Sequence, residues 1–578
     1  MRVKGPERWF LGLLVVLSVH HASVLAGVPA IMVSVRSTSV LNLGDLIGSL
    51  YLWFITLVNV AGLALAGLFG RALPPLASLV GVSVVAALGG PKEVLEALTV
   101  ANVAVLATAL YREGREALVK VFESAAYILA AYSVASATYA VAFKLSGGRV
   151  TPSPLIFDRA VYAALTAALP AATLALIFRW PVDVGLLIKG RGRYLSRVTG
   201  LRGFLSTWRA LAVAVAITEL VVLLPLAIYG RPVIVSEDTK VYAYDLRIID
   251  ERGLPTVMST ISRFRELRGR WEPGFDIAQK PLHAIATYGA YKLSGLSPVV
   301  LLDYIHHAVF LAAVVFLLWL VVRDLFGRYV AGISALLAST SYLVAGFRVG
   351  GFYANEVSLT LYLLITYLLI NIGRDTSLKA FLAIALGLAM LLIHPWSGLL
   401  YTSSLIPLAL TLHLRGGGRR LLALRALVPL VTIALAIGLA VGVLGVRRLY
   451  VLYYLYYQRV AGFHRLLGAL REEPLTTYLA YLTTNAVHHY CWCSLCTPLT
   501  YLPALASVYD PLTLSLAIPA SIVALSGGLE VYFRVCLLLP ALITSAVTYA
   551  RLGSKAFTWL AIAAGLSNTA YVVMGVIT

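Results

Sequence analysis

Residues 231–281 read RPVIVSEDTKVYAYDLRIIDERGLPTVMSTISRFRELRGRWEPGFDIAQKP, and they form the one long polar stretch in a chain that is otherwise mostly apolar. The segment carries an acidic cluster of Glu237, Asp238 and Asp245 beside many arginines. Long apolar stretches precede and follow it. Because loops held by a rigid scaffold commonly carry function, this segment is the first place to look for a binding or catalytic site.

The composition indicates a membrane protein. Hydrophobic residues make up 60% of the 578 residues, charged residues make up only 12%, and the mean hydropathy is +0.88. We therefore predict an all-α fold, a polytopic transmembrane helical bundle. The formal net charge of +20 is explained by Lys and Arg in inner loops. We expect no nucleic-acid partner, since no folded basic domain carries that charge.

Apolar runs near the length that crosses a bilayer recur along the chain, and we expect about 13 to 16 spans. The four cysteines are too few for a disulfide scaffold. The segment 447–530 stays open, because either 477–496 is an imperfect span or 499–523 is a re-entrant pair. The other runs lie at about 9–35, 46–69, 73–90, 94–111, 123–144, 158–178, 206–229, 300–322, 329–347, 356–373, 378–395, 397–413, 425–446, 531–550 and 556–576.

Basic clusters predict the orientation, because cytoplasmic loops carry an excess of Lys and Arg. Lys4 and Arg8 precede the first run, and further clusters follow the fourth and the sixth runs. All fall on one side if each run crosses once. We therefore expect a multi-pass protein of the cell membrane with a cytoplasmic N-terminus and an extracytoplasmic acidic loop at 230–281.

The acidic loop is expected to contain interfacial helices. In SEDTKVYAYDLRIIDERGLPT, the apolar residues could face the membrane surface while the charged residues face water. The stretch WEPGFDIAQKPLHAIATYGAYKLSGLSP begins with a Pro-Gly turn and continues as a second interfacial helix with aromatic residues at the headgroup level. The residues of the first helix are Leu246, Ile249 and Leu254 on the apolar side and Arg247, Asp250 and Glu251 on the polar side.

This order of features resembles the GT-C superfamily of membrane glycosyltransferases, including the protein O-mannosyltransferase-like and RgtA-like families. EDTKVYAYDLRIIDERGLP looks like their acidic motif, EPGFDIAQKPL like their Pro-Pro-Gly segment, and RDLFGRYVAGISALLASTSY like the next inner turn and helix. The likeness covers roughly residues 206–550. The chain departs from the family in two respects. Seven crossings are expected before the acidic loop, whereas a typical member has one, and the sequence has no WWDYG-like motif.

With this resemblance the chain divides into three parts. Residues 1–205 form an N-terminal transmembrane helical module, and residues 206–446 form a GT-C-like transmembrane core that contains the outer acidic loop 230–281. Residues 447–578 form a C-terminal outer loop and transmembrane helices.

The resemblance implies transfer of a sugar, mannosyltransferase-like, from a polyprenyl (dolichyl) phosphate donor. The acceptor would be a glycan, a lipid or a protein at the outer face of the membrane. A carboxylate near the sugar can act as general base on an acceptor hydroxyl. Asp238 matches the acidic position best and is expected to be the base or a ligand of a divalent cation, with Glu237 second and Asp245 third. The alternative is that these carboxylates only pair with basic neighbours on a solvated loop.

The leaving group would be a lipid phosphate, whose developing charge needs Arg or Lys donors. The candidates are Lys280, Arg348 and Arg534. Arg348 lies in GFRVGGFYANE, which reads as a glycine-rich outer turn where backbone could approach a ligand. Arg534 could instead snorkel to the interface. His394, in LLIHPWSGLL, is expected at an outer helix end, where an interfacial structural role is the alternative.

The stretch HHYCWCSLC at 488–496 offers His489, Cys493 and Cys496 as ligands for tetrahedral zinc. We favour the alternative that the cysteines of this stretch form a disulfide or are plain buried thiols. His306 and His307 lie inside an expected span, and adjacent positions face different sides of a helix. That pair alone therefore predicts no shared metal site.

Two other functions compete with sugar transfer. A transporter or flippase of a lipid-linked substrate, without catalysis, should bury paired charges in its spans. Charges inside the expected spans look few, and the acidic cluster lies in a loop, which favours the enzyme. A structural subunit of a larger assembly is the third interpretation.

Overall fold

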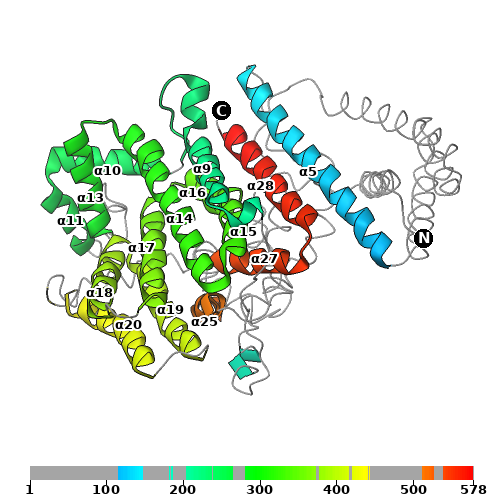
Figure 1. Ribbon diagram of the computed structural model, residues 1–578. Helices are drawn as coiled ribbons and strands as arrows, with labels where there is room; N and C mark the ends of the chain where they lie inside the picture. Colours follow the sequence, from blue (N-terminus) through cyan, green and yellow to red (C-terminus); the bar gives the residue numbers. More distant parts are fainter. Residues whose placement is uncertain are drawn as a thin grey trace, which may run out of the picture.

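The computed structural model describes residues 115–146, 203–236, 238–263, 280–372, 376–414, 419–439, 511–525 and 538–576, with residues 181–182, 184–185 and 442. Regular structure in these ranges is helical, which confirms the all-α prediction (Figure 1). The expected runs between 9 and 111, at 158–178 and at 477–496 lie outside the described residues.

The helices follow the expected apolar runs closely. The first described helix, α5, is longer than its run at 123–144. The elements are α5 (Arg115–Leu145), η1 (Phe204–Ser206), α9 (Trp208–Tyr229), α10 (Thr239–Arg252), α11 (Leu254–Arg263), α13 (Pro281–Ser294), η2 (Val300–His306), α14 (His307–Phe326), α15 (Arg328–Ser339), α16 (Tyr342–Gly350), α17 (Tyr353–Ile370), α18 (Thr376–Ile393), α19 (Pro395–Leu414), α20 (Arg419–Leu439), α25 (Pro511–Leu525), α27 (Leu538–Leu552) and α28 (Lys555–Val576).

Among the described residues, 7 helical stretches are long and apolar enough to cross a membrane, as a polytopic protein requires. Two of them combine neighbouring elements, η2 with α14 and α15 with α16. The stretches are Trp208–Tyr229, Val300–Phe326, Arg328–Gly350, Tyr353–Ile370, Thr376–Ile393, Pro395–Leu414 and Leu421–Leu439. We call these stretches the spans.

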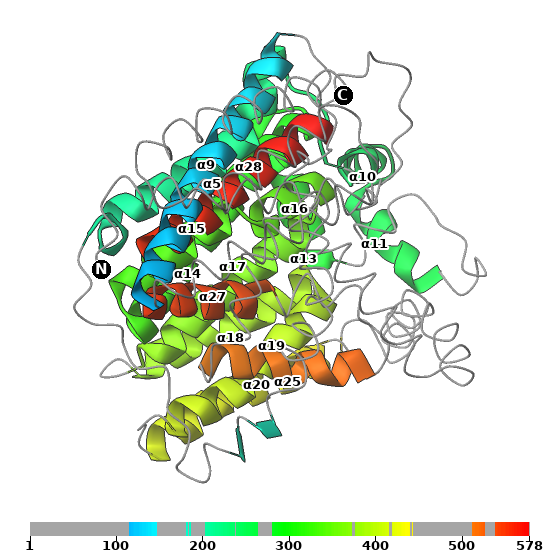
Figure 2. The same cartoon turned by 90° about the vertical axis from the view of Figure 1, so that its right-hand side faces the viewer.

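The spans form a bundle around α14 and α15. Helix α14 packs against α9, α15 and α17, while α17 also contacts α18 and α19 (Figure 1). Side chains on several sides of α14 are buried, among them Val314, Leu317 and Trp319, so this helix lies inside the bundle. Helix α28 lies along α5 (Figure 2).

The span that was expected at 329–347 is longer and interrupted. Helix α15 ends at Ser339, and α16 begins after Ser341, whose side chain accepts a hydrogen bond from the backbone N–H of Leu343 at 3.2 Å. Helix α16 then continues to Gly350. Arg348 therefore lies in the last turn of α16 and is buried, and the glycine turn of this stretch follows it at Gly351.

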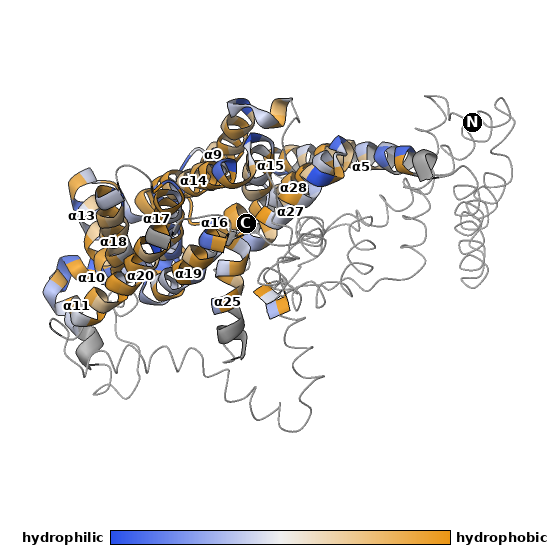
Figure 3. Ribbon diagram, turned by 60° about the horizontal axis from the view of Figure 1, so that its bottom comes forward, coloured by the Kyte–Doolittle hydropathy of each residue, from blue (hydrophilic) through white to orange (hydrophobic). Residues whose placement is uncertain are grey.

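Helices α10, α11 and α13 lie together at one end of the bundle, between α9 and η2 in the chain. Figure 3 shows hydrophilic residues on them beside the mostly hydrophobic α9 and α14. The expected apolar side of α10 is confirmed, with Leu246 and Ile249 buried, but it packs on protein rather than on the membrane surface. Its partners include Ala284, Leu302 and Tyr353.

Polar side chains join three spans at the opposite end of the bundle. Asp324 at the end of α14 accepts hydrogen bonds from Arg323 Nε at 2.7 Å and from Asn371 Nδ2 at 2.8 Å. Lys379 Nζ of α18 donates to the backbone oxygen of Asn371 at 2.7 Å. These contacts fix the ends of α14, α17 and α18, whose other ends lie near α10 and α13.

The contact between α15 and η1 generates a first prediction, because it leaves no room for a side chain at Gly332. A Cβ there would lie 2.0 Å from the backbone oxygen of Leu205. Gly332→Ala is expected to lower the free energy of unfolding by about 1–3 kcal/mol, the usual cost of overpacking. Thermal unfolding of the full chain in detergent measures this.

Gly289 in α13 is the matched control, since a Cβ there meets nothing within 4 Å. Gly289→Ala should raise the free energy of unfolding by about 0.5–1 kcal/mol, because glycine is unfavourable inside a helix. Equal stability of the two variants would contradict the close packing of α15 on η1.

Candidate functional site

The first part of the acidic loop folds back onto the start of the α14 span. The hydroxyl of Tyr304 accepts a hydrogen bond from Val233 N–H and donates one to Val233 O, both at 3.0 Å. The carboxylate of Asp303 accepts from the backbone N–H groups of Val235 at 3.2 Å and Ser236 at 3.3 Å. We call residues 233–236, 238 and 239 the docked segment.

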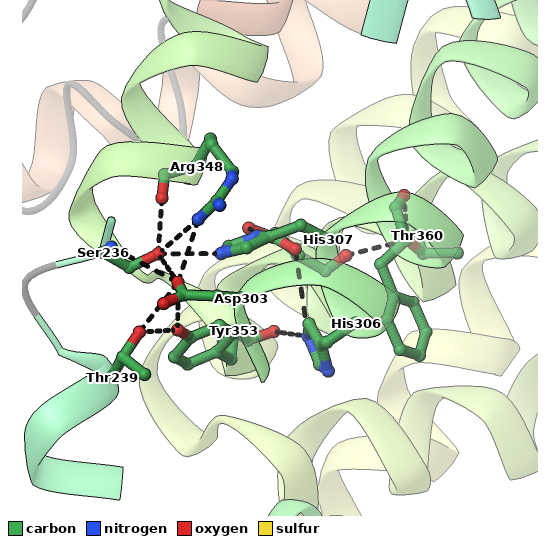
Figure 4. A network of polar contacts seen from close by, with 10 residues as sticks. Ser236, Thr239, Asp303, His306, His307, Arg348, Tyr353 and Thr360 are labelled. Carbon is green, nitrogen blue, oxygen red and sulfur yellow. Dashed lines mark hydrogen bonds and ion pairs between the residues drawn. The ribbon is translucent and has the colours of Figure 1, made fainter. Parts of the chain in front are cut away.

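Side chains of the docked segment reach the same carboxylate. The hydroxyl of Thr239 donates to Asp303 Oδ1 at 2.8 Å, and the hydroxyl of Ser236 also contacts Oδ1. Tyr353 at the start of α17 donates to Oδ1 at 3.3 Å and contacts the hydroxyl of Thr239 (Figure 4). Asp303 is thus surrounded by donors from three parts of the chain, the docked segment, α16 and α17.

Asp303 lies in η2, a stretch of π-helix that precedes α14. A π-helix has more residues in each turn than an α-helix, and such stretches are frequent at functional sites. From η2, Asp303 and Tyr304 both reach the docked segment. His306, at the end of η2, contacts the backbone oxygen of Tyr353 through Nε2 at 3.1 Å.

Arg348 is the cation that opposes Asp303. Its Nη1 lies 2.9 Å from Asp303 Oδ1, and both side chains are fully buried. The same nitrogen donates to the hydroxyl of Ser236 at 2.9 Å, and the guanidinium lies 5.4 Å from the centre of the Tyr304 ring. An arginine donor to a carboxylate is a strong hydrogen bond, so this contact links α16 to both η2 and the docked segment.

A second buried acid–base pair lies beside the first. His307 Nδ1 is 2.7 Å from Glu356 Oε1, and its Nε2 is 3.2 Å from the hydroxyl of Ser236. His306 Nε2 is 3.8 Å from Glu356 Oε2. Although the two histidines are adjacent in the sequence, both reach Glu356 from the junction of η2 with α14.

Asp238, the preferred candidate for the base, is half-buried at the N-cap position of α10. It lies directly beside the end of α16, where Gly351 has a positive φ of 70°. A Cβ on Gly351 would lie 3.0 Å from the Cβ of Asp238 and 3.1 Å from the Cβ of Ser236. Glycine therefore allows both the turn and the close approach of the docked segment.

The other predicted carboxylates differ in their position. Asp245 is buried on α10 at 3% exposure, which contradicts the alternative of a solvated loop for this residue. Asp250 is exposed, and its ion pair with Lys292 at 2.5 Å holds the pKa of its carboxyl group below the usual value. Glu237 lies outside the described residues.

Lys280 and His394 lie around a second polar group, centred on His283. Lys280 donates to the hydroxyl of Tyr242 and lies 4.9 Å from the centre of that ring. His283 packs edge-on against Tyr242 at 5.6 Å and His306 at 5.7 Å between ring centres. Burial, helped by the nearby cations and histidines, lowers the pKa of His283 well below its ordinary value, so its ring is neutral.

His394 lies at the junction of α18 with α19, as the sequence predicted. Its Nδ1 accepts a hydrogen bond from the backbone N–H of Ser397 at 3.1 Å, so the ring caps the start of α19. It is close enough to His283 to contribute to the lowered pKa of that ring. The structure thus brings Lys280 and His394 to one group, next to the group that contains Arg348.

The candidate metal ligands are Asp238 and the group of His489, Cys493 and Cys496, and the described part of the chain includes only Asp238, whose role as a ligand stays a prediction. In the described part, no group of three His, Cys, Asp or Glu side chains is arranged to hold a metal ion. His489, Cys493 and Cys496, like Arg534, lie outside the described residues, so their roles stay predictions.

Comparisons with protein-family models, curated proteins and solved structures give no match to this chain. The function therefore has to be argued from the geometry of the site.

Sequence reasoning missed the residues that organise the site. Asp303 and Glu356 are lone carboxylates within the apolar runs 300–322 and 356–373, and an ionisable residue inside a span marks a functional site by default. That signal was available for both. The charges inside the spans look few in the sequence, yet Asp303 and Arg348 form a buried pair there.

The buried ion pair generates the second prediction. Asp303→Asn leaves the cation of Arg348 buried without an anionic partner, which typically costs roughly 3–5 kcal/mol of stability. Arg348→Met should cost a similar amount. The double variant should lose less than the sum of the single variants, since the two residues act on each other. Thermal unfolding of the full chain in detergent measures all three.

Lys292→Met is the control for this series, because the ion pair of Lys292 with Asp250 is on the surface. Surface ion pairs contribute little, so the unfolding temperature should not change. Additive effects of Asp303→Asn and Arg348→Met would show that the pair carries no mutual stabilisation.

Proposed function

We propose that the chain is a membrane glycosyltransferase that transfers a sugar from a polyprenyl phosphate donor to an acceptor hydroxyl at the outer face of the membrane. The observation that carries the proposal is the position of Asp238. This half-buried carboxylate lies at the end of the bundle, beside α16 and within the segment that is docked on Asp303.

The order of elements supports this proposal. One span, α9, is followed by the acidic docked segment, then by helices α10, α11 and α13 beside the bundle, and then by the α14 span. This is the order in which GT-C enzymes carry their acidic motif and the helices that follow it. The resemblance in sequence covers the same residues.

The chemistry of the docked segment also fits. A carboxylate can accept the proton of an acceptor hydroxyl and thereby raise its nucleophilicity at the anomeric carbon of the sugar. Asp238 is held in place because its neighbours Ser236 and Thr239 are bonded to Asp303. A base that is positioned by rigid neighbours loses little freedom when the substrates bind.

Arg348 is suited to the phosphate of the donor. Its Nη1 serves Asp303 and Ser236, while Nε and Nη2 are buried and have no hydrogen-bond partner within the described residues. Buried donors normally have partners, and phosphate oxygens are strong acceptors for arginine. Lys280, at the start of α13, is a second candidate for the same negative charge.

The third prediction tests the base. Asp238→Asn should reduce sugar transfer by about 100-fold or more, which is the usual contribution of general acid–base catalysis. The assay is transfer of a radiolabelled sugar from polyprenyl phosphate donors by the full chain in proteoliposomes. Transfer that is unchanged in Asp238→Asn would remove Asp238 from the mechanism.

Asp250→Asn is the matched control, since it removes a carboxylate from the other end of α10. Asp250 is exposed and paired with Lys292, so transfer should stay near that of the unmodified chain. A loss of activity in both variants would point to a general effect of charge in this region rather than to a base at Asp238.

Transport of a lipid-linked substrate is the second candidate, and the buried charges favour it. Paired ionisable residues inside spans mark substrate and ion pathways in transporters, and both Arg348 with Asp303 and His307 with Glu356 lie in spans. Dithionite quenching of a fluorescent polyprenyl phosphate sugar in vesicles would detect its movement across the bilayer. Movement without sugar transfer for any donor would support transport.

A further inference from the structure

The positions of hydrogens around Ser236 follow from the groups that surround its hydroxyl. The backbone oxygen of Arg348 lies in the last turn of α16, where carbonyl groups lack partners within the helix. The hydroxyl of Ser236 is 2.6 Å from this oxygen and also contacts Asp303 Oδ1. Both acceptors are closer than His307 Nε2 at 3.2 Å, so the single hydrogen of Ser236 is directed away from His307.

The contact between Ser236 and His307 therefore needs a hydrogen on the histidine. The oxygen of Ser236 has two lone pairs, and Nη1 of Arg348 donates to it at 2.9 Å. The remaining lone pair accepts from His307 only if Nε2 carries a hydrogen. The order of Ser236, His307 and Glu356 is that of a catalytic triad, but these hydrogens make Ser236 an anchored hydroxyl rather than a nucleophile.

A further hydrogen must lie between His307 and Glu356. Nδ1 of His307 is 2.7 Å from Glu356 Oε1, a distance that requires a hydrogen on one of the two atoms. With Nε2 also protonated, the pair is either an imidazolium with a carboxylate or a neutral imidazole with a carboxylic acid. Both forms carry no net charge and hold one proton more than a neutral histidine with an ionised glutamate.

Loss of that proton would leave a buried negative charge. Arg348 is already paired with Asp303, and Tyr353 bonds to Asp303 rather than to Glu356. Within the described residues, the basic groups in salt-bridge distance of Glu356 are His306 and His307. His306 donates to the oxygen of Tyr353, while on α13 the ring of His283 is neutral and Lys280 donates to Tyr242.

We propose that His307 and Glu356 are positioning residues that share this one proton, and that the proton keeps the docked segment in place through Ser236. When the proton is lost, the buried charge and the changed hydrogen bonds favour release of Ser236 from the cluster. The effect on catalysis rests on the proposed function, because the docked segment contains Asp238. The effect on docking is independent of it.

Glu356→Gln tests whether docking depends on the shared proton or on a negative charge at position 356. The amide of glutamine donates to Nδ1 of His307, which keeps the hydrogen on Nε2 and the neutral charge of the pair. The variant therefore imitates the protonated pair and cannot lose the proton. His307→Ala removes the donor to Ser236 and represents the released state.

The experiment, which is the fourth prediction, measures docking by the reaction of a cysteine with maleimide. In a background whose four native cysteines are replaced by serine, Val235→Cys places a reporter at a position with 5% exposure. Ile234→Cys, at 44% exposure, corrects for the faster reaction of any thiol at high pH. The full chain is labelled in detergent from about pH 6 to about pH 10, and the ratio of the two rates reports release.

With His307 and Glu356 unchanged, the ratio of the Val235→Cys rate to the Ile234→Cys rate should rise with pH as the proton is lost. The rise should reach up to about tenfold for each pH unit, since one proton is linked to release. With Glu356→Gln it should stay low at every pH, and with His307→Ala it should be high at every pH. A flat ratio in the unmodified pair, or the same rise in Glu356→Gln, overturns the proposal. No step needs sugar transfer, so failure of the proposed function and failure of this inference are distinguished.

Discussion

The carboxylate of Asp303 is the group on which the arrangement of the site depends. It accepts hydrogen bonds from the backbone of Val235 and Ser236 and from the side chains of Thr239 and Arg348. One residue in the span therefore fixes the segment that enters the acidic loop and also α16. Without this acceptor, the backbone N–H groups of Val235 and Ser236 would lose the hydrogen-bond partner that they have in the bundle, which is costly.

The buried charges are tolerated because each ionisable side chain lies against an ionisable partner of the opposite kind. Isolating an ion from water costs several kcal/mol, and a close pair with additional hydrogen bonds offsets this cost. Arg348 is opposed by Asp303, and the pair of His307 with Glu356 has no net charge in either of its forms. The cluster as a whole is neutral, and Ser236 is the residue that connects its two pairs.

The sequence predicts much of the fold and part of the site. Hydropathy gave the spans because a run of apolar residues determines a helix locally, and periodicity gave the buried side of α10 with Leu246 and Ile249. Arg348 was selected for its charge, yet its surroundings were not predicted. Ser236 and Asp303 are 67 residues apart, and local patterns contain no information on which distant partner a buried carboxylate will meet.

The same geometry bears on the choice between catalysis and transport. Charged groups that carry a substrate or an ion through a bilayer have to exchange partners between two conformations. Asp303 is bonded to the docked segment, α16 and α17 at once, so any exchange of partners would also have to release the segment that carries Asp238. A network that is bonded on so many sides is better suited to hold a loop still than to move. Within the described residues, Nε and Nη2 of Arg348 have no hydrogen-bond partner, so the network that holds the loop leaves two buried donors unused.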